Sequence, residues 1–484
     1  MLVKGKERPA FKYNIDTEIS IGNLNFLSEF LKRNYLLQKE KYRDFKQINI
    51  KIENDNQFLS YRVLVPNSAL YVDILVEADI PIKVTMIPND SKVSKTFLDQ
   101  LYEDLFLMVQ LFEEEIRKTT LYLGFMPGEK ITTEKEQRSI IGRIFTESMI
   151  SLYIILMAMT FVLFFIFGSL GPLIFVFLLF SLSILSGKIV AKSGDWTISK
   201  DHQEIILLQY HFSPETFEFF RKKYADKISE IKRRIYDNSI SSGKLPNCEA
   251  SSKIFSEYGI DCKTENLSIK KINIYNIVKE AANKFGLKMP KVVVKNTIIP
   301  NAAAAGPTPR LGTILITTGI LNQLEQDELL SVIGHEMSHL KAHDPLVMSS
   351  LTSLEFLLRF YVFLPYINSI GLFGFWIYFI FAIGLIYFFG KFLEGRADLD
   401  SAKIIGQPKV MAEALRKIGF KRLFPLYKRE PKFKDYRRSE WLRFDLHPPV
   451  YHRIAQLEKL EDPDKIKHTF LKTVKDNIIG FLKP

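Results

Sequence analysis

No charged side chain occurs between Met149 and Gly187, and a folded domain in water rarely buries an apolar run of that length. Turn-forming residues at 168–172 (GSLGP) divide the run into two halves. About 20 apolar residues suffice for a helix to cross the roughly 30 Å hydrocarbon core of a bilayer, so each half matches one crossing. We therefore predict a membrane hairpin over residues 146–190. The alternative, two buried core helices, fits poorly because the run exceeds the length of an ordinary globular helix.

A second apolar block runs over residues 345–390 and is interrupted at 365–369 (PYINS). Its first half contains Glu355 and Arg359, which lie four positions apart and would share one face of a helix, where their charges neutralise each other. We expect this pair to face protein or a water-filled cavity, and the block to form a second membrane hairpin. The alternative is that its first half lies at the membrane interface or packs on a soluble domain.

The charges that flank the two hairpins predict their orientation. Neither connecting turn carries a lysine or arginine, whereas basic residues flank both hairpins, namely Arg138, Arg143, Lys188, Lys192, Lys341, Lys391 and Arg396. Positive charge is retained on the cytoplasmic side of membranes. We therefore predict a multi-pass protein of the cell membrane whose flanking segments, including the N-terminal domain, are cytoplasmic. Residues 1–14 lack the apolar core of a cleavable signal peptide.

The net charge of +12 is spread among acidic residues, without the clustered stripe of a nucleic-acid footprint. We expect no nucleic-acid partner, and an anionic membrane surface accounts for the charge better. The two cysteines, Cys248 and Cys262, exclude a disulfide framework. We expect a chance pair or two free thiols, rather than a zinc or redox site, because a metal site would need more ligands.

The remaining segments predict soluble structure. Residues 1–145 alternate as an α+β domain, with helices expected at 24–41 and 94–118 and strands at 47–52, 58–65, 70–77 and 81–87. Residues 191–268 contain a charged helix at 214–236 and a break at 239–243, which we interpret as a cytoplasmic connector or insertion. Neither segment carries residues that look catalytic.

Residues 327–344 (DELLSVIGHEMSHLKAHD) form an apolar-periodic helix with acidic residues in its first turn, where the helix dipole favours them. His335 and His339 lie four positions apart, so both imidazoles can reach one tetrahedral zinc ion. Glu336 would lie beside the water that zinc makes acidic, and its carboxylate would accept a proton as this water attacks a peptide carbonyl. His343 could compete as a ligand, but the helix ends there and we expect a helix-end residue. The alternative is a chance string of core or solvated histidines beside a surface glutamate.

A catalytic zinc site needs a third protein ligand and one open position. The string EGRAD at residues 394–398, beyond the second hairpin, places Glu394 and Asp398 on one face of a helix. We expect Glu394 to bind the metal and Asp398 to orient a ligating imidazole. Surface charges are the alternative interpretation of both.

At this point the sequence resembles a known family, the membrane zinc metallopeptidases that include the heat-shock protease HtpX and, more distantly, the type I CAAX prenyl proteases. The resemblance runs from about Ile272 to Leu457. It rests on the string HEMSH at 335–339, of the form HExxH, and on EGRAD at 394–398, with a hydrophobic hairpin between them. Further strings occur in the same order as in the family: MPKVVV at 289–294, PNAAAAG at 300–306, TTG at 317–319, HPP at 447–449, and Arg453, Ile454 and Leu457.

The resemblance implies one Zn²⁺ per chain held by His335, His339 and Glu394, with Glu336 as general base and Asp398 in support. It also implies that the strand near residues 298–305 is a substrate-binding edge, so we expect substrate contacts at Asn301, Ala302, Ala303 and Arg453. His447 would be catalytic by stabilising the oxyanion, although a histidine flanked by proline is as often structural. The 1–145 domain and the length of the 191–268 connector depart from the family pattern.

The expected fold class is α+β with transmembrane helices: a mainly helical zincin-type metallopeptidase domain with a small edge β-sheet, two membrane hairpins and an N-terminal soluble domain. The expected boundaries are 1–145, 146–190, 191–268, 269–344, 345–390 and 391–484. We expect a zinc endopeptidase that hydrolyses membrane or misfolded proteins at the cytoplasmic face, with protein substrates and the lipid bilayer as partners. A homo-oligomer, a specific processing protease of the CAAX type and a non-catalytic membrane scaffold are alternatives that the sequence leaves open.

Overall fold

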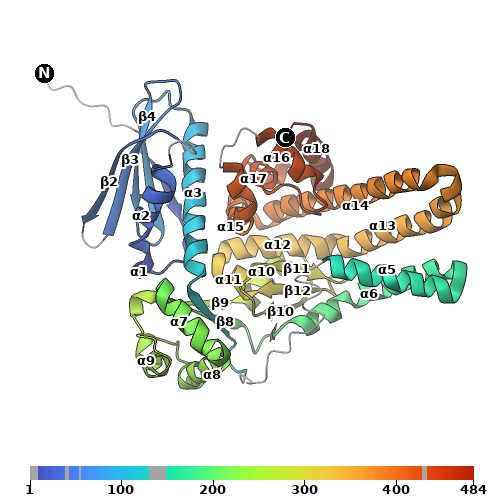
Figure 1. The fold of residues 1–484 in the computed structure, drawn as a ribbon, viewed down its shortest axis with the longest axis horizontal. Coiled ribbons are helices and arrows are strands. Elements are labelled where there is room, and N and C mark those ends of the chain that lie inside the picture. The colour runs from blue at the N-terminus through green and yellow to red at the C-terminus, as the bar shows by residue number, and fades with distance from the viewer. Residues whose placement is uncertain (1–8, 39–42, 54–55, 130–148, 428–432, 484) are drawn as a thin grey trace. The chain divides into compact units, whose positions relative to one another are not determined.

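The computed structural model describes residues 9–38, 43–53, 56–129, 149–427 and 433–483 (Figure 1). Two compact units are formed from alternating stretches of chain. The first comprises residues 1–133, 206–271 and 419–433, and the second comprises 134–205, 272–418 and 434–484. Arg138 and Arg143, which entered the prediction of orientation, lie outside the described residues, as does the stretch 130–148 around the predicted boundary at 145.

A five-stranded antiparallel sheet forms the N-terminal part of the first unit, in the order β1-β5-β4-β3-β2. The strands are β1 (Phe11–Ile15), β2 (Phe45–Glu53), β3 (Asn56–Leu64), β4 (Tyr71–Glu77) and β5 (Ile82–Pro88). Period-two alternation buries Leu59, Tyr61 and Val63 on one face of β3. The long helix α3 (Lys95–Arg117) is capped by the Ser94 hydroxyl, and its Tyr102 stacks on Tyr13 of β1.

Three differences from the expected elements are local. The strand β1 was not predicted from the sequence. The helix expected at 24–41 is broken into α1 (Ile21–Leu24), α2 (Leu27–Leu31) and a π-helical turn (Lys32–Leu36). The helix expected at 214–236 is α7 (Pro214–Tyr224) and α8 (Ile228–Asn238), separated by a 3₁₀ turn. Helix ends and single-turn breaks depend on packing that local periodicity does not report.

The first unit also contains a three-stranded sheet in the order β6-β8-β9. Its strands are β6 (Thr120–Phe125), β8 (Glu204–His211) and β9 (Leu267–Asn273), and they share one hydrophobic core with α7, α8 and α9 (Cys248–Glu257). β6 comes from the predicted N-terminal domain and β8 from the predicted connector, and the two strands pair antiparallel. The two segments therefore share a sheet.

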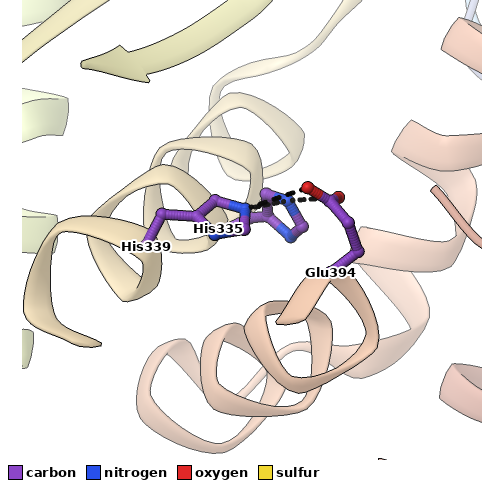
Figure 2. A group of neighbouring side chains, drawn as sticks. All are labelled: His335, His339 and Glu394. Carbon is purple, nitrogen blue, oxygen red and sulfur yellow. Dashed lines mark hydrogen bonds and ion pairs between the residues drawn. The ribbon is translucent and has the colours of Figure 1, made fainter. Parts of the chain in front are cut away.

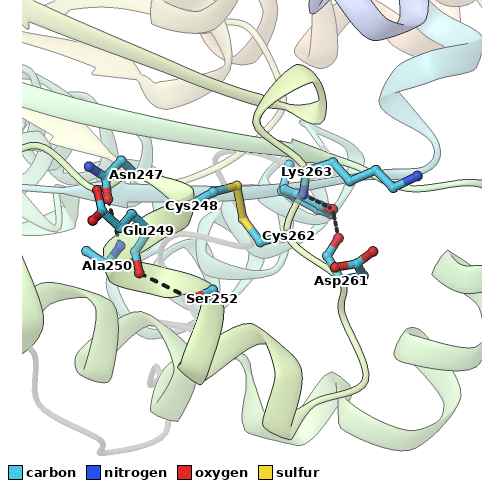
Figure 3. Close-up of a disulfide and its surroundings, with 9 residues drawn as sticks. Asn247, Cys248, Glu249, Ala250, Ser252, Asp261, Cys262 and Lys263 are labelled. Atoms are coloured by element: carbon cyan, nitrogen blue, oxygen red, sulfur yellow. Dashed lines mark hydrogen bonds between the residues drawn. A yellow bond between two sulfur atoms is a disulfide. The ribbon is translucent and has the colours of Figure 1, made fainter.

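The sequence left open whether the two cysteines are paired or free, and in the structure they form a disulfide. Cys248, the first residue of α9, is bonded to Cys262, which follows that helix, with an S–S distance of 2.03 Å (Figure 3). The Cα atoms are 5.5 Å apart across a loop of 14 residues. The bond therefore closes a local turn and is no framework for the fold.

The second unit is built on a four-stranded sheet in the order β11-β12-β10-β7. β10 (Lys291–Lys295) runs parallel to β12 (Thr313–Thr317), while β11 (Ala302–Ala305) and β7 (Trp196–Ile198) pair antiparallel to their neighbours. Helix α12 (Gln326–Ala342) packs against α10 (Ile274–Phe285), α14 (Ile367–Ile405) and β11. Gly334 permits the approach of α12 to α14, because a Cβ there would lie 2.7 Å from the Ser401 hydroxyl. The remaining helices are α11 (Thr318–Gln323), α15 (Pro408–Tyr427), α16 (Phe433–Leu442), α17 (Val450–Glu458) and α18 (Thr469–Leu482).

Two segments in the described part of the chain are helical, long and apolar enough to cross a membrane, Ala158–Ser193 and Asp344–Ile405. The first consists of the part of α5 (Met149–Phe167) from Ala158 onward and of α6 (Gly171–Ser193), joined by a 3₁₀ turn at Gly168–Leu170 within the predicted break. The second consists of α13 (Asp344–Leu358), a π-helical turn, a 3₁₀ turn and α14. Figure 1 shows each segment folded back on itself, with α5 beside α6 and α13 beside α14.

The polar groups of these apolar segments face one another. The Arg359 guanidinium lies 3.1 Å from the Glu355 carboxylate, as the four-residue spacing predicted, and the Tyr378 hydroxyl of α14 donates to the same carboxylate. Between the segments, the Ser349 hydroxyl of α13 donates to Ser183 of α6. Polar side chains in an apolar surrounding are stabilised when they find such partners.

Candidate active site

Helix α12 presents two histidines to one point. Its first turn is closed by a reciprocal capping box between Glu325 and Glu328, which satisfies amide groups that a helix start leaves unpaired. His335 and His339 follow one turn apart, and their Nε2 atoms are 3.1 Å from each other. Both rings therefore direct a nitrogen to the same place.

The third donor comes from α14, which returns from the second apolar segment. The Glu394 carboxylate oxygens lie 3.4 Å from His335 Nε2 and 3.4 Å from His339 Nε2 (Figure 2). Each of these three residues offers one donor atom, and the three donor atoms lie within 4.8 Å of one another. Two ligands about 2.0–2.1 Å from a tetrahedral zinc ion are about 3.3 Å apart, so the observed separations suit a shared metal.

A buried atom without a hydrogen-bond partner supports the same fit. Within the described residues, Glu394 Oε2 is buried and accepts no hydrogen bond, and it makes only the longer contacts with imidazole nitrogens. Such an atom costs free energy unless something else compensates its charge. A cation held by the three donors would do so.

Each of the two histidines is held from behind by an aspartate. His335 Nδ1 lies 2.9 Å from Asp398 Oδ1, and His339 Nδ1 lies 2.6 Å from Asp344 Oδ2. Carboxylates in this position fix the ring orientation and leave Nε2 to the metal. The Asp398 contact was expected. The Asp344 contact was missed, because Asp344 lies five positions beyond His339 in sequence and reaches it only through the left-handed turn at His343.

Each aspartate is in turn paired with a buried arginine. Arg453 of α17 makes two hydrogen bonds of 2.7 Å to Asp398, and Arg396 of α14 lies 2.5 Å from Asp344. The structure thus places Arg453 behind the histidines, buried against Asp398, whereas the sequence analysis expected it to contact substrate. Arg396, expected only as a flanking charge of the hairpin, was missed as part of this cluster.

The charges of the cluster leave room for a dication. The two arginines balance Asp344 and Asp398, whereas Glu336 accepts from a backbone amide and Glu394 contacts imidazoles. Burial by itself would lower the pKa of His335. The Asp398 and Glu394 carboxylates outweigh this effect, and the pKa is raised to about 10. The surroundings therefore favour positive charge at this point.

Glu336 lies between the histidines and the edge strand. Its side chain is buried, and its Oε2 accepts a hydrogen bond of 2.7 Å from the Ala304 amide of β11. Burial raises the pKa of the Glu336 carboxyl. A carboxylate with a raised pKa is a better proton acceptor than an ordinary surface glutamate.

The expected substrate residues lie on the outermost strand of this sheet. Ala302 and Ala303 belong to β11, which ends the strand order, and Asn301 precedes it. Asn301 is tied to β12 by main-chain and hydroxyl hydrogen bonds with Thr317. The strand is therefore fixed beside Glu336.

His447 approaches the same centre from the loop before α17. Its Nε2 lies 3.3 Å from Glu394 Oε2, its Nδ1 lies 3.0 Å from Asp445, and its side chain is half exposed. The Glu394 carboxylate raises the pKa of His447. His343, in contrast, caps the C-terminus of α12, with its Nδ1 near the Leu340 carbonyl, and is not among the three converging donors.

Two imidazoles one helical turn apart, a carboxylate from a later helix and an adjacent buried glutamate define the centre of a metallopeptidase, here joined to apolar helices of membrane length. Comparison with known proteins agrees with this class of protein. The sequence profile described as Peptidase family M48 matches residues 268–461. The chain belongs to this family.

Relatives of this chain include HtpX proteases and their homologs. The chain is 34% identical to a protease HtpX homolog of Methanothermobacter thermautotrophicus over 33% of its own length and 63% of that protein. It is 30% identical to protease HtpX of Pasteurella multocida, over 39% of the chain and 72% of the relative. It is 31% identical to protease HtpX homolog 2 of Methanosarcina acetivorans, over 36% and 67% respectively. The chain is thus an HtpX-like member of the family.

The contact between Asp344 and His339 leads to a testable prediction. We expect Asp344→Asn to weaken metal binding by about 10-fold to 100-fold, because an amide orients the imidazole less firmly and makes it a weaker donor. Chelator competition on the purified full-length protein measures this affinity. The matched control is Asp400→Asn, since Asp400 also lies near Arg396, at 3.8 Å, but its hydrogen-bond partner is the Ser338 hydroxyl rather than His339. Equal affinities of the two variants would show that the His339 contact contributes nothing.

Proposed function

We propose that this protein is a zinc-dependent endopeptidase that hydrolyses peptide bonds of membrane or misfolded proteins at the cytoplasmic face of the cell membrane. The observation that carries the proposal is the convergence of His335, His339 and Glu394 beside Glu336 and an edge strand. Membership of peptidase family M48 supports the hydrolytic class.

His335, His339 and Glu394 would hold the metal, and Asp398 and Asp344 would keep the two rings in place. A zinc ion in this position would supply a Lewis acid that polarises a peptide carbonyl and lowers the pKa of water towards neutrality. Glu336 would accept the proton of the attacking water and pass it to the leaving amine. The Ala304 amide keeps the Glu336 carboxylate in place for this proton transfer.

The substrate would add to the edge of the sheet as an extended strand. β11 is paired only with β12 in the sheet order, so its outer main-chain groups near Asn301, Ala302 and Ala303 can bind a peptide backbone. Such binding reads backbone rather than side chains, which suits unfolded substrates. His447, whose Nε2 lies 3.3 Å from Glu394 Oε2, would donate a hydrogen bond to the oxyanion.

The cytoplasmic orientation is supported by the flanks of the apolar segments. Lys188 and Lys192 end the first segment, and Lys391 and Arg396 lie near the end of the second. The Cys248–Cys262 disulfide points towards an oxidising compartment instead. The short separation of 14 positions brings the two cysteines together whichever side of the membrane they occupy, so the disulfide does not set the orientation.

The experiment is a metal and cleavage assay on the full-length protein in lipid vesicles. We expect about one zinc per chain, cleavage of a loosely folded chain such as casein, loss of cleavage with a chelator, and recovery when zinc is restored. Zinc-loaded protein that refuses casein but cuts a prenylated peptide would instead identify a specific processing protease. Protein that binds no zinc and cuts neither substrate would contradict the enzymatic proposal and favour a membrane scaffold.

A further inference from the structure

The last helix, α18 (Thr469–Leu482), packs on the protein with polar and small side chains. It lies beside α14 (Figure 1), and Thr473 and Asn477 are buried in the contact. The Asn477 amide donates to the Lys391 carbonyl of α14, and its oxygen lies 3.2 Å from His452. A Cβ on Gly395 would lie 2.5 Å from Thr473, so the two helices approach closely beside the proposed ligand Glu394.

The other side of α18 is apolar and exposed. At about 100° per residue six of its seven apolar side chains fall within an arc of about 120°, and the seventh, Ile479, lies about 60° beyond that arc and is 47% exposed. The residues of this apolar arc are Phe470, Leu471, Val474, Ile478, Phe481 and Leu482, and among them Leu471 and Leu482 are 64% and 67% exposed. A helix in water buries its apolar stripe and exposes its polar one. The burial of α18 is the reverse of that pattern.

The apolar arc is continuous with the apolar surface of α14. Phe470 lies against Phe389, and Phe481 against Phe388, with ring centroids 6.5 and 5.7 Å apart. Nearby, Phe444 is 61% exposed and contacts Tyr387 of α14. Since α14 belongs to a segment suited to cross a membrane, the arc extends the apolar surface that this segment would present to lipid.

Charge on α18 suits the surface of a bilayer. Lys472, Lys475 and Lys483 lie outside the apolar arc, and of these Lys472 pairs with Asp476. Helices that lie in the membrane interface have an apolar face together with lysines on the polar side, which meet anionic headgroups.

We propose that α18 is an interfacial membrane helix, with its apolar arc inserted at the boundary between headgroups and acyl chains where α14 leaves the bilayer. Its partner is the lipid surface itself. Because Thr473 and Asn477 contact α14 within one turn of Glu394, insertion of α18 would brace the turn that carries this residue against the membrane. The helix would thereby hold the centre close to the bilayer, where membrane-bound substrates emerge.

Fluorescence quenching in vesicles tests the proposal without reference to proteolysis. Leu471→Cys, Ile478→Cys and, as the matched control outside the apolar arc, Lys472→Cys are labelled with the polarity-sensitive dye NBD in the full-length protein. Labelling is done without reductant, and the unsubstituted chain serves as the labelling blank. In vesicles with anionic lipid we expect labels at 471 and 478 to emit at shorter wavelength, to be quenched by lipid carrying a nitroxide near the headgroup, and to be several-fold less quenched by iodide than the label at 472.

Two outcomes would overturn the proposal. Equal quenching by iodide at all three positions would place the apolar arc in water. Protection of 471 and 478 from both quenchers, increasing with the amount of protein per vesicle, would place the arc against a second copy of the chain. The two arc positions are exposed in the structure, so each substitution is tolerated independently and one failure to fold leaves the other readout.

Discussion

Replacing Glu336 by Gln is expected to lower kcat for peptide hydrolysis by about 10²-fold to 10⁴-fold, the range by which a positioned general base accelerates a reaction. A carboxamide does not accept the proton of the attacking water. Its oxygen can still accept the Ala304 amide hydrogen bond, so the variant keeps the shape of the wild-type site. The measurement is single-turnover cleavage of a loosely folded protein by the reconstituted full-length chain, with zinc content determined on the same sample.

Asp327→Asn is the matched control, because it neutralises an exposed acid on the same helix, two turns before His335. This variant should cleave at close to the wild-type rate. If Glu336→Gln cleaves as fast as the control while it binds zinc, Glu336 is not the general base. If it has lost zinc, the carboxylate acts on metal binding and the assignment of roles within the cluster must change.

The second large effect is expected for Glu394→Gln, which should weaken metal binding beyond the 10-fold to 100-fold that loss of a supporting carboxylate causes. The substitution removes one of three converging donors and one of the two carboxylates that no arginine in the described cluster balances. Two imidazoles alone would hold the ion weakly, and hydrolysis should fall with occupancy.

Chelator competition for zinc provides the measurement, and Glu336→Gln provides the comparison, since both variants remove one negative charge from the same buried cluster. We expect Glu336→Gln to keep the wild-type affinity and Glu394→Gln to lose it. The same affinity in both would mean that charge, rather than coordination by Glu394, governs binding. Circular dichroism of the metal-free proteins checks that neither substitution unfolds the helices.

Much of the architecture could be predicted because its signals are local. Uncharged runs of membrane length marked α5, α6 and α14, and period-two alternation marked β2 to β5. Spacing along one helix predicted that His335 and His339 would face the same point. The family resemblance brought Glu394 into the prediction, since 55 residues and a hydrophobic hairpin separate it from His339.

Other features have no local signal because they depend on how distant segments pack. Nothing in the periodicity of residues 191–268 predicts that β8 would pair with β6, which lies before the first apolar segment. The sequence suggested a flanking charge of the hairpin for Arg396 and a substrate contact for Arg453, yet the structure buries both against aspartates.

The sequence by itself therefore determined that His335 and His339 share one helix face and where the apolar helices lie, because both depend on spacing within a single helix. The tertiary structure alone decided which aspartate and arginine stand behind each histidine, which amide of β11 meets Glu336, and which face of α18 is left exposed. Amphipathic spacing says only that a helix has two faces. Which face is buried depends on what packs against it, and for α18 the packed face is the polar one.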